Sequence, residues 1–139
     1  MVASPTYLAQ HGVPTQPSDL RRHNCMTFNF HRTVGPWRFV EDATGAKLSG
    51  NTEVSNGETL KQLVLAGVGI GRLAAFHVVD DIAQGRLQVL LKEHDPGDIE
   101  EVHALWIGRD HLASRTRSFI DFLVETVSPK LREAEHLLN

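Results

Sequence analysis

The residues best suited to binding chemistry lie at the start of a predicted helix. Ser55 and Glu58 are three positions apart, which is the spacing of a capping box. In that motif the Ser55 side chain accepts a hydrogen bond from the backbone N–H of Glu58, and the Glu58 carboxylate accepts one from the N–H of Ser55. The first helical turn also has N–H groups without intrahelical partners and a partial positive charge, so it can bind a carboxylate or another anion. The same residues also fit a capped helix that only packs on a sheet, and such helices far outnumber ligand sites.

The histidines and the cysteine form no recognisable metal or nucleophile motif. The sequence has eight histidines, but His94 and Asp98 fall in one predicted loop, and His103 and His111 lack helical spacing. Zinc sites need three or four ligands at short, recurring spacings. Cys25 opens an apolar strand with no basic group beside it, which favours a buried, unreactive thiol over a nucleophile. We therefore expect no catalytic residue, no metal and no cofactor.

Two further patterns have simple structural explanations. Asp80 and Asp81 are adjacent, so on a helix they point apart and indicate a solvated face rather than an acid–base pair. Gly67, Gly69 and Gly71 follow a predicted helix and precede a strand, which is the reverse of a dinucleotide-binding loop. We interpret Gly67 and Gly69 as a helix stop, since glycine readily adopts the left-handed conformation at a helix end.

These residues are positioned by a predicted alternation of strands and helices. Leu60, Leu63 and Val64 form an apolar stripe that faces inward, and Ile70–Phe76 follows as a buried strand. One other predicted helix begins at Ser4-Pro5 and ends near His11-Gly12, and a second begins at Pro17. Two more span Val78–Ala83 and Ser114–Val127. The other predicted strands are Cys25–Phe30, Trp37–Glu41, Leu48–Val54, Leu87–Leu91 and Val102–Ile107. The fold class is therefore α/β with a mixed, largely buried sheet.

Composition narrows the functional classes. The chain has 139 residues, of which 41% are hydrophobic and 22% charged, as in an ordinary globular domain. Its 14 Lys+Arg and 17 Asp+Glu give a net charge of −3, which argues against nucleic-acid binding by these residues. The single cysteine suits a reducing cytoplasm. No stretch approaches the roughly 20 apolar residues of a membrane span, and the first residues, MVASPTYLAQHG, do not resemble a signal peptide.

Three segments in series resemble a known family. They are SPTYLAQHGVPTQPSDLRRHNCM, SNGETLKQLVLAGVGIGRLAAFHVVDDIAQGRLQVLL and HALWIGRDHLASRTRSFIDFLVETV. Together they are similar to the effector-binding (substrate-binding-like) domain of LysR-type transcriptional regulators, in the family's order and over nearly the whole chain. The resemblance implies a mixed-sheet lobe of a type 2 periplasmic-binding-protein-like domain, in which a small-molecule effector binds between two α/β lobes.

The resemblance also implies that the chain is a truncated regulator. Residues 1–108 correspond to the second lobe, regulatory subdomain II of the effector-binding domain. Residues 109–139 correspond to the C-terminal return segment and to a helix that belongs to the missing first lobe. The family's helix-turn-helix, linker helix and main first lobe have no counterpart in these residues.

The last predicted helix would then lack its usual partner. Phe119, Ile120 and Leu123 lie near one face of it. Exposing several such side chains to water is unfavourable, because burial of each is worth roughly 1.5–3 kcal/mol. We therefore expect this helix to dock on its own lobe, to swap into a neighbouring molecule or to drive dimerisation.

Position within the family indicates which residues would contact an effector. The principal candidates are at the helix start and the secondary ones at the ends of neighbouring strands: Ser55, Asn56, Gly57, Glu58 and Thr59, followed by Asn29, Phe30 and Leu73. Ser55 and Asn56 would form hydrogen bonds, and the helix N-terminus would hold an anion such as a carboxylate. The carboxylate of Glu58 argues against a highly charged anion. Leu73 lies in Leu73-Ala74-Ala75, where relatives often have Leu-Pro.

The function implied by the resemblance is effector sensing and oligomerisation in a cytoplasmic regulator. A small metabolite would bind, the chain would form a homo-oligomer such as a dimer, and DNA would be reached only through a helix-turn-helix domain outside these residues. The alternative is a truncated structural fragment that self-associates and binds no ligand. An enzyme ranks last, because the sequence contains no convergent acid–base or nucleophile set.

Overall fold

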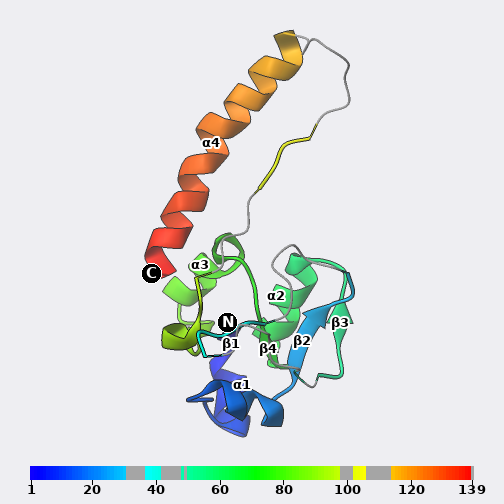
Figure 1. The fold of residues 1–139 in the computed structure, drawn as a ribbon, viewed down its shortest axis with the longest axis vertical. Coiled ribbons are helices and arrows are strands. Elements are labelled where there is room, and N and C mark those ends of the chain that lie inside the picture. The colour runs from blue at the N-terminus through cyan, green and yellow to red at the C-terminus, as the bar shows by residue number, and fades with distance from the viewer. Residues whose placement is uncertain (31–36, 42–47, 49, 98–101, 106–113, 139) are drawn as a thin grey trace. The chain divides into compact units, whose positions relative to one another are not determined.

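The computed structural model describes residues 1–30, 37–41, 48, 50–97, 102–105 and 114–138 (Figure 1). The chain divides into two compact units, residues 1–100 and residues 101–139, which are described separately. The predicted lobe boundary at residues 108 and 109 lies outside the described residues.

A five-stranded mixed sheet forms the centre of the first unit (Figure 1). Its strand order is β3-β2-β4-β1-β5. Strand β2 pairs in parallel with both β3 and β4, whereas β1 pairs antiparallel with β4 and β5. The strands are β1 (Val2–Ala3), β2 (Cys25–Phe28), β3 (Glu53–Val54), β4 (Ile70–Gly71) and β5 (Gln88–Val89). The predicted mixed α/β class is confirmed.

Short helices connect these strands. They are α1 (Pro5–His11), the 3-10 helix η1 (Pro17–Arg22), α2 (Gly57–Leu65), α3 (Ala75–Ala83) and the 3-10 helix η2 (Lys92–His94). The predicted start of α1 is confirmed, because the Ser4 Oγ atom accepts a hydrogen bond from the Tyr7 backbone N–H at 3.3 Å. Its predicted end is also confirmed, because Gly12 follows the helix with a left-handed φ of 83°.

Helix α2 ends as predicted at Gly67, which has a φ of +76°. The Gly67 N–H donates to the Val64 carbonyl at 3.0 Å and the Val68 N–H donates to the Leu63 carbonyl at 3.1 Å. This pair of bonds is a Schellman motif and satisfies two carbonyls of the last turn. Gly69 does not share the left-handed conformation, so its prediction as a second helix stop is wrong. It is small because the backbone of Asn24 passes close to it.

Several predicted strands are shorter than their apolar patterns. Strand β4 stops at Gly71, and Phe76 belongs to helix α3 instead of the predicted strand Ile70–Phe76. A short apolar run does not by itself distinguish a buried strand from the start of a helix. Strand β3 covers only Glu53–Val54 of the predicted 48–54, and β5 only Gln88–Val89 of the predicted 87–91.

Two predicted strands are absent from the described residues. At Trp37–Glu41 only Phe39 makes a single bridge pairing, and the chain then turns. Its alternating pattern arises because Trp37 and Phe39 are both buried in the core. The segment Val102–Leu105 is irregular and exposed, and the rest of that predicted strand, residues 106–107, lies outside the described residues. Alternation alone does not make a strand, because a strand also needs a paired neighbour.

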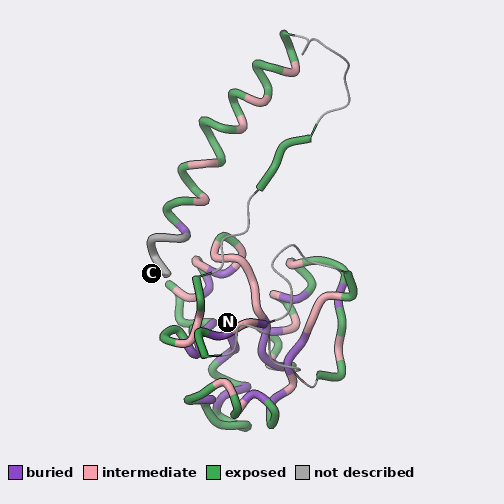
Figure 2. Tube along the Cα trace, viewed as in Figure 1, coloured by how far each residue is buried: buried purple, intermediate pink, exposed green. Residues whose placement is uncertain are grey.

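The core of the first unit lies between the sheet, α1, η1 and the segment that contains Trp37 (Figure 2). Its buried residues are Ala3, Tyr7, Leu8, Leu20, Cys25, Trp37, Phe39, Ile70, Leu90 and Leu91. Helix α2 packs on β4 through Leu60 and Val64. Both side chains lie so close to Gly71 that a Cβ atom added there would be 2.8 Å from Val64 Cγ2 and 3.3 Å from Leu60 Cγ. This packing fixes the start of α2 relative to the sheet.

The second unit contains helix α4, Ser114–Leu138. It extends past the predicted end at Val127 and includes Pro129, which has no backbone N–H to donate to the preceding turn. Large apolar side chains on it are exposed: Phe119, Phe122, Val124 and Val127. Within the described part of the chain, no helix is both long and apolar enough to span a bilayer.

Candidate functional site

Three neighbouring strands end at the same edge of the sheet. Strands β2, β3 and β4 are parallel, and their registers pair Phe28 with Val54 and Met26 with Gly71. The Asn29 N–H donates to the Val54 carbonyl at 3.0 Å, which continues this alignment past the last strand residue. The segments that follow the three strands therefore begin side by side. In open sheets, ligands bind in the crevice outside such carboxyl ends.

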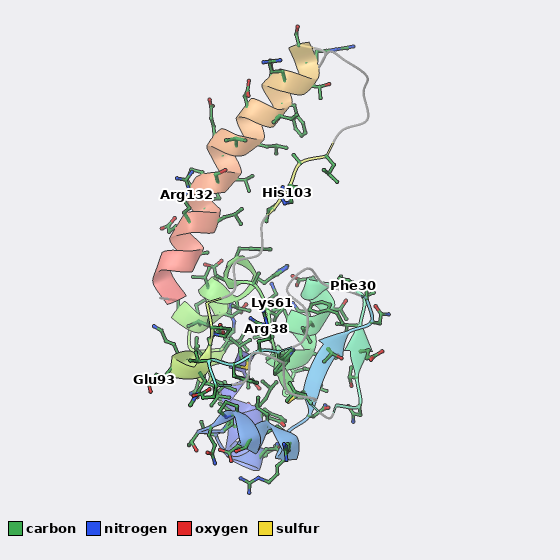
Figure 3. All side chains as sticks on the ribbon, in the orientation of Figure 1. Phe30, Arg38, Lys61, Glu93, His103 and Arg132 are labelled. Carbon is green, nitrogen blue, oxygen red and sulfur yellow. The ribbon has the colours of Figure 1, made fainter. Side chains whose placement is uncertain are left out.

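This edge carries the eight residues predicted to contact an effector. Asn29 and Phe30 follow β2, Ser55–Thr59 follow β3, and Leu73 follows β4. All of them are exposed except Gly57 and Leu73, which are partly buried. Phe30 lies beyond the end of β2 (Figure 3), with half of its surface exposed and its ring centroid 5.2 Å from that of Phe28. The edge thus combines hydrogen-bonding groups with an accessible aromatic surface.

The predicted capping box at Ser55 and Glu58 is wrong. The N-cap is Asn56, whose Oδ1 atom accepts a hydrogen bond from the Thr59 N–H at 2.8 Å. Asparagine caps helices as well as serine does, and the helix begins one residue later than predicted. The Glu58 carboxylate instead accepts from Gln62 Nε2 at 2.9 Å and pairs with Lys61 Nζ at 3.0 Å. These bonds, first that from Gln62 and then that from Lys61, lower the pKa of Glu58.

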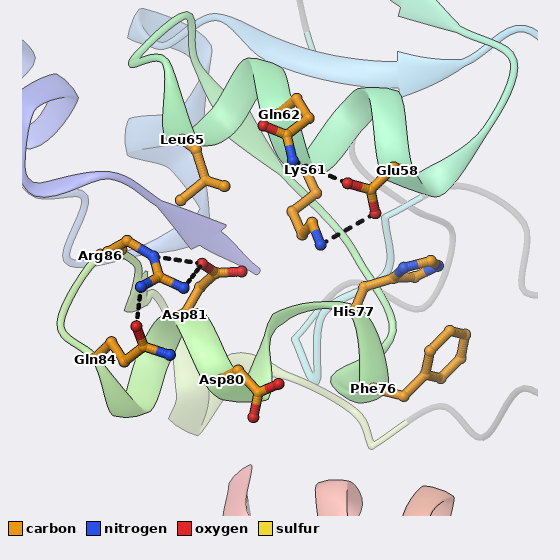
Figure 4. A pocket seen from close by; sticks show the side chains of 10 residues that line it. All are labelled: Glu58, Lys61, Gln62, Leu65, Phe76, His77, Asp80, Asp81, Gln84 and Arg86. Atoms are coloured by element: carbon orange, nitrogen blue, oxygen red, sulfur yellow. Dashed lines mark hydrogen bonds and ion pairs between the residues drawn. The ribbon is translucent and has the colours of Figure 1, made fainter. Parts of the chain in front are cut away.

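An open polar groove of about 550 Å³ lies between α2 and α3. Figure 4 shows Glu58, Lys61 and Gln62 of α2 on one side and Phe76, His77 and Asp80 of α3 on the other. The remaining lining residues are Leu65, Asp81, Gln84 and Arg86. Glu58 is the one predicted contact among the lining residues. Sequence reasoning missed the others because it placed Phe76 in a strand and had no means of pairing α2 with α3.

The charges in this groove are largely paired with each other. Arg86 Nε donates to Asp81 Oδ1 at 2.7 Å, and Arg86 also contacts Gln84. Asp81 is buried, so its prediction as part of a solvated face is wrong, whereas Asp80 is exposed as expected. The start of α2 meets α3 closely, because a Cβ atom on Gly57 would lie 2.6 Å from His77 Nε2. The groove shows paired charges and no nucleophile beside a base.

The environment of Cys25 agrees with its prediction as an unreactive thiol. Cys25 is buried, as predicted, and burial raises the pKa of its thiol to about 12. Among the residues that the structure describes, no three His, Cys, Asp or Glu side chains are grouped as metal ligands would be. His111 and Asp98, weighed above as ligands, lie outside the described residues.

Replacing Asn56 by alanine tests the identity of the cap. We expect Asn56→Ala to lower the free energy of unfolding by about 1 kcal/mol, because the Thr59 N–H loses its acceptor. Asn56→Asp should preserve stability, and Ser55→Ala should change it by less than about 0.5 kcal/mol. Urea unfolding measures all three. If Ser55→Ala proved as destabilising as Asn56→Ala, the cap would be Ser55 after all.

The chain is similar to proteins of one known family over most of its length. The family profile described as LysR substrate binding domain matches residues 1–128. The HTH-type transcriptional regulator CrgA of Neisseria meningitidis serogroup C is 38% identical over 133 residues, which cover 94% of this chain and 44% of that protein. The probable HTH-type transcriptional regulator LtrA of Klebsiella pneumoniae is 31% identical, with 90% and 42% covered. The chain thus spans less than half the length of these curated relatives.

Solved structures agree with these matches. The regulatory domain of CrgA, a LysR-type transcriptional regulator from Neisseria meningitidis, superposes with a TM-score of 0.74 at 38% identity and covers 89% of this chain and 61% of that domain. The regulatory domain of AphB in Vibrio vulnificus, at 22% identity and a TM-score of 0.57 with 89% and 62% covered, shares the fold. The curated relatives are regulators, which agrees with the expectation that the chain is not an enzyme.

Proposed function

Because the chain belongs to the family of LysR substrate-binding domains, we propose that it is the effector-sensing and oligomerisation part of a transcriptional regulator. The protein would act in the cytoplasm as a homo-oligomer such as a dimer. DNA would be bound by a helix-turn-helix part outside these residues, since the net charge of −3 disfavours DNA binding by this chain itself.

The observation that carries this proposal is the shared edge of β2, β3 and β4. Parallel pairing aligns these three strands, so the segments that contain Asn29 and Phe30, the start of α2, and Leu73 follow from the same edge of the sheet, although they are far apart in the sequence. We define Asn29, Phe30, Leu73 and Ser55–Thr59 as the effector wall. One wall of a cleft needs accessible polar groups to orient a ligand and apolar surface to bury it. The effector wall provides both.

The chemistry of the effector wall favours a small carboxylate or a similar metabolite. Backbone N–H groups and the helix macrodipole at the start of α2 attract negative charge. The Ser55 hydroxyl is exposed and can donate a hydrogen bond. The Glu58 carboxylate would repel a multiply charged anion, but its pairing with Lys61 at 3.0 Å reduces this repulsion for a single charge.

Regulation would follow from differential binding. A ligand shifts a protein between two arrangements only by as much as it prefers one of them. An effector that contacts the effector wall and a facing lobe would stabilise the closed arrangement of the two. The same free energy would then change the affinity of the attached DNA-binding parts for their operator.

Ligand binding to the chain tests the proposal. We expect one member of a panel of small carboxylates to raise the melting temperature, since binding stabilises by about 2.7 kcal/mol at 100 times its Kd. Ser55→Ala should weaken this ligand about fivefold, the equivalent of one hydrogen bond of about 1 kcal/mol. Phe30→Ala should also weaken it, because the exposed ring would no longer cover the ligand.

Phe119→Ala is the matched control, because it removes another exposed aromatic ring, from α4 rather than from the effector wall. It should bind the ligand like the parent chain. If no carboxylate binds at millimolar concentration, or if Ser55→Ala and Phe30→Ala bind as the parent does, the assignment of the effector wall fails.

A self-associating fragment without ligand binding is the second candidate. It is favoured by the exposed apolar side chains of α4, notably Phe119 and Phe122, whose exposed fractions are 60% and 57%. Light scattering with and without the carboxylate panel separates the candidates. An oligomer that dissociates on Phe119→Ser and ignores every ligand would support this second function instead of the first.

A further inference from the structure

A buried imidazole connects three segments of the first unit at the start of β2. His23 ends η1, and only 7% of its surface is exposed. Its Nδ1 atom lies 3.2 Å from the Tyr7 hydroxyl of α1. The same hydroxyl accepts a hydrogen bond from the Asn24 backbone N–H at 3.0 Å. We define Tyr7, His23 and Asn24 as the junction triad.

The junction triad holds a wider set of backbone contacts through Asn24. The Asn24 carbonyl accepts from the Ile70 N–H of β4 at 2.9 Å. Its side chain donates to the Val68 carbonyl at 3.0 Å and accepts from the Asn51 N–H at 3.1 Å. Any change that displaces Asn24 is therefore transmitted to the turn after α2 and to the β2–β4 pairing.

The hydrogen bonds of the Tyr7 hydroxyl favour one protonation state of His23. Because the Tyr7 oxygen already accepts from Asn24, the Tyr7 hydroxyl can donate its own hydrogen to His23 Nδ1. This donation requires a neutral imidazole with its hydrogen on Nε2. A protonated His23 would instead present a second donor to the Tyr7 oxygen, and the Tyr7 hydrogen would lose its acceptor.

The surroundings also disfavour a charged His23. Burial makes the largest contribution to lowering the pKa of His23, and the nearby His11 and Arg22 lower it further. Asp19 of η1 acts in the opposite direction, but the backbone N–H groups of Thr15 and Gln16 already bind its carboxylate. From α1, the ring of His11 stacks on Tyr7 with centroids 4.3 Å apart.

We propose that the junction triad is a proton-sensitive latch: protonation of His23 on acidification reverses its bond to Tyr7 and loosens the contacts of Asn24 with β4 and with the turn after α2. The native state binds fewer protons at this site than the unfolded chain does. Stability is then fully present above the ordinary histidine pKa of about 6.5 and is lost as the pH falls below it.

Urea unfolding of the full chain between about pH 8 and about pH 5 tests the latch through His23→Asn. Asparagine places an oxygen near the former Nδ1 position, so it can accept from Tyr7 but cannot be protonated. The unfolding equilibrium constant of the parent should rise with falling pH by up to about tenfold per unit more than that of the variant. His103→Asn, an exposed histidine of the second unit, should keep the parental pH dependence.

An NMR titration of the parent chain provides a second measurement that does not depend on the folding of a variant. The His23 imidazole of the folded chain should titrate below about 6.5. A midpoint at or above that value would overturn the latch, as would equal pH dependence of the parent and His23→Asn. A parental pH dependence that is lost in His103→Asn instead would assign the titration elsewhere and also overturn it.

Discussion

Gly69→Ala is expected to lower the free energy of unfolding by about 3 kcal/mol. A Cβ atom at this position would lie 2.2 Å from the Asn24 carbonyl oxygen, far closer than van der Waals contact allows. The oxygen belongs to the backbone and accepts from the Ile70 N–H at 2.9 Å, so it cannot rotate away without breaking that bond. The strain therefore acts on the β2–β4 pairing itself.

Urea unfolding and the melting temperature measure this loss, and Gly85→Ala is the matched control. Gly85 has a left-handed φ of +70° but nothing within 4 Å of an added Cβ atom. It should lose only about 1–2 kcal/mol, the cost of a left-handed alanine. A loss for Gly69→Ala no larger than that for Gly85→Ala would show that the Asn24 carbonyl can move away from an added Cβ atom at little cost, and would contradict this prediction.

Leu60→Ala is expected to cost about 3 kcal/mol, within the usual range for a buried leucine. Leu60 is 1% exposed and packs with Val64 against Gly71, which places α2 on β4. Alanine removes the buried methyl groups and leaves a cavity that the helix and the sheet cannot easily close. The same loss should loosen the start of α2, where the effector wall begins.

Leu60→Met conserves most of the side-chain volume and is the control. It should cost less than about 1.5 kcal/mol. Denaturant unfolding of both variants decides the point. A loss from Leu60→Ala as small as that from Leu60→Met would show that α2 does not depend on this contact for its position.

Features determined by neighbouring residues were predicted well from the sequence. The Ser4 cap, the end of α1 near Gly12 and the end of α2 at Gly67 each depend on a few consecutive residues, and each is confirmed. The prediction of the capping residue of α2 is wrong because Ser55 and Asn56 are both good caps and are adjacent in the sequence. Choosing between them requires the position of α2 on β4, which no local pattern contains.

Features that depend on distant partners were predicted poorly. Strand β1 has two residues, too few for a periodic pattern, yet Val2 pairs with both Gly71 and Val89. The groove between α2 and α3 likewise depends on helix packing. The family resemblance is confirmed by the match over residues 1–128, and it supplied the effector wall, which stays a prediction. The segments that contain residues 29, 55 and 73 follow strands that are paired in parallel, and the sequence alone does not specify that pairing.

The burial of Cys25 makes its thiol a natural probe of local opening in the first unit. It is the chain's single cysteine, its Sγ atom lies 3.6 Å from the Leu20 carbonyl, and its thiol pKa is about 12. At neutral pH the buried thiol is therefore almost entirely protonated, and thiolate is the form that reacts. An alkylating reagent should therefore modify the chain only during moments when β2 leaves the core. The labelling rate then reports how often that happens, without any engineered probe.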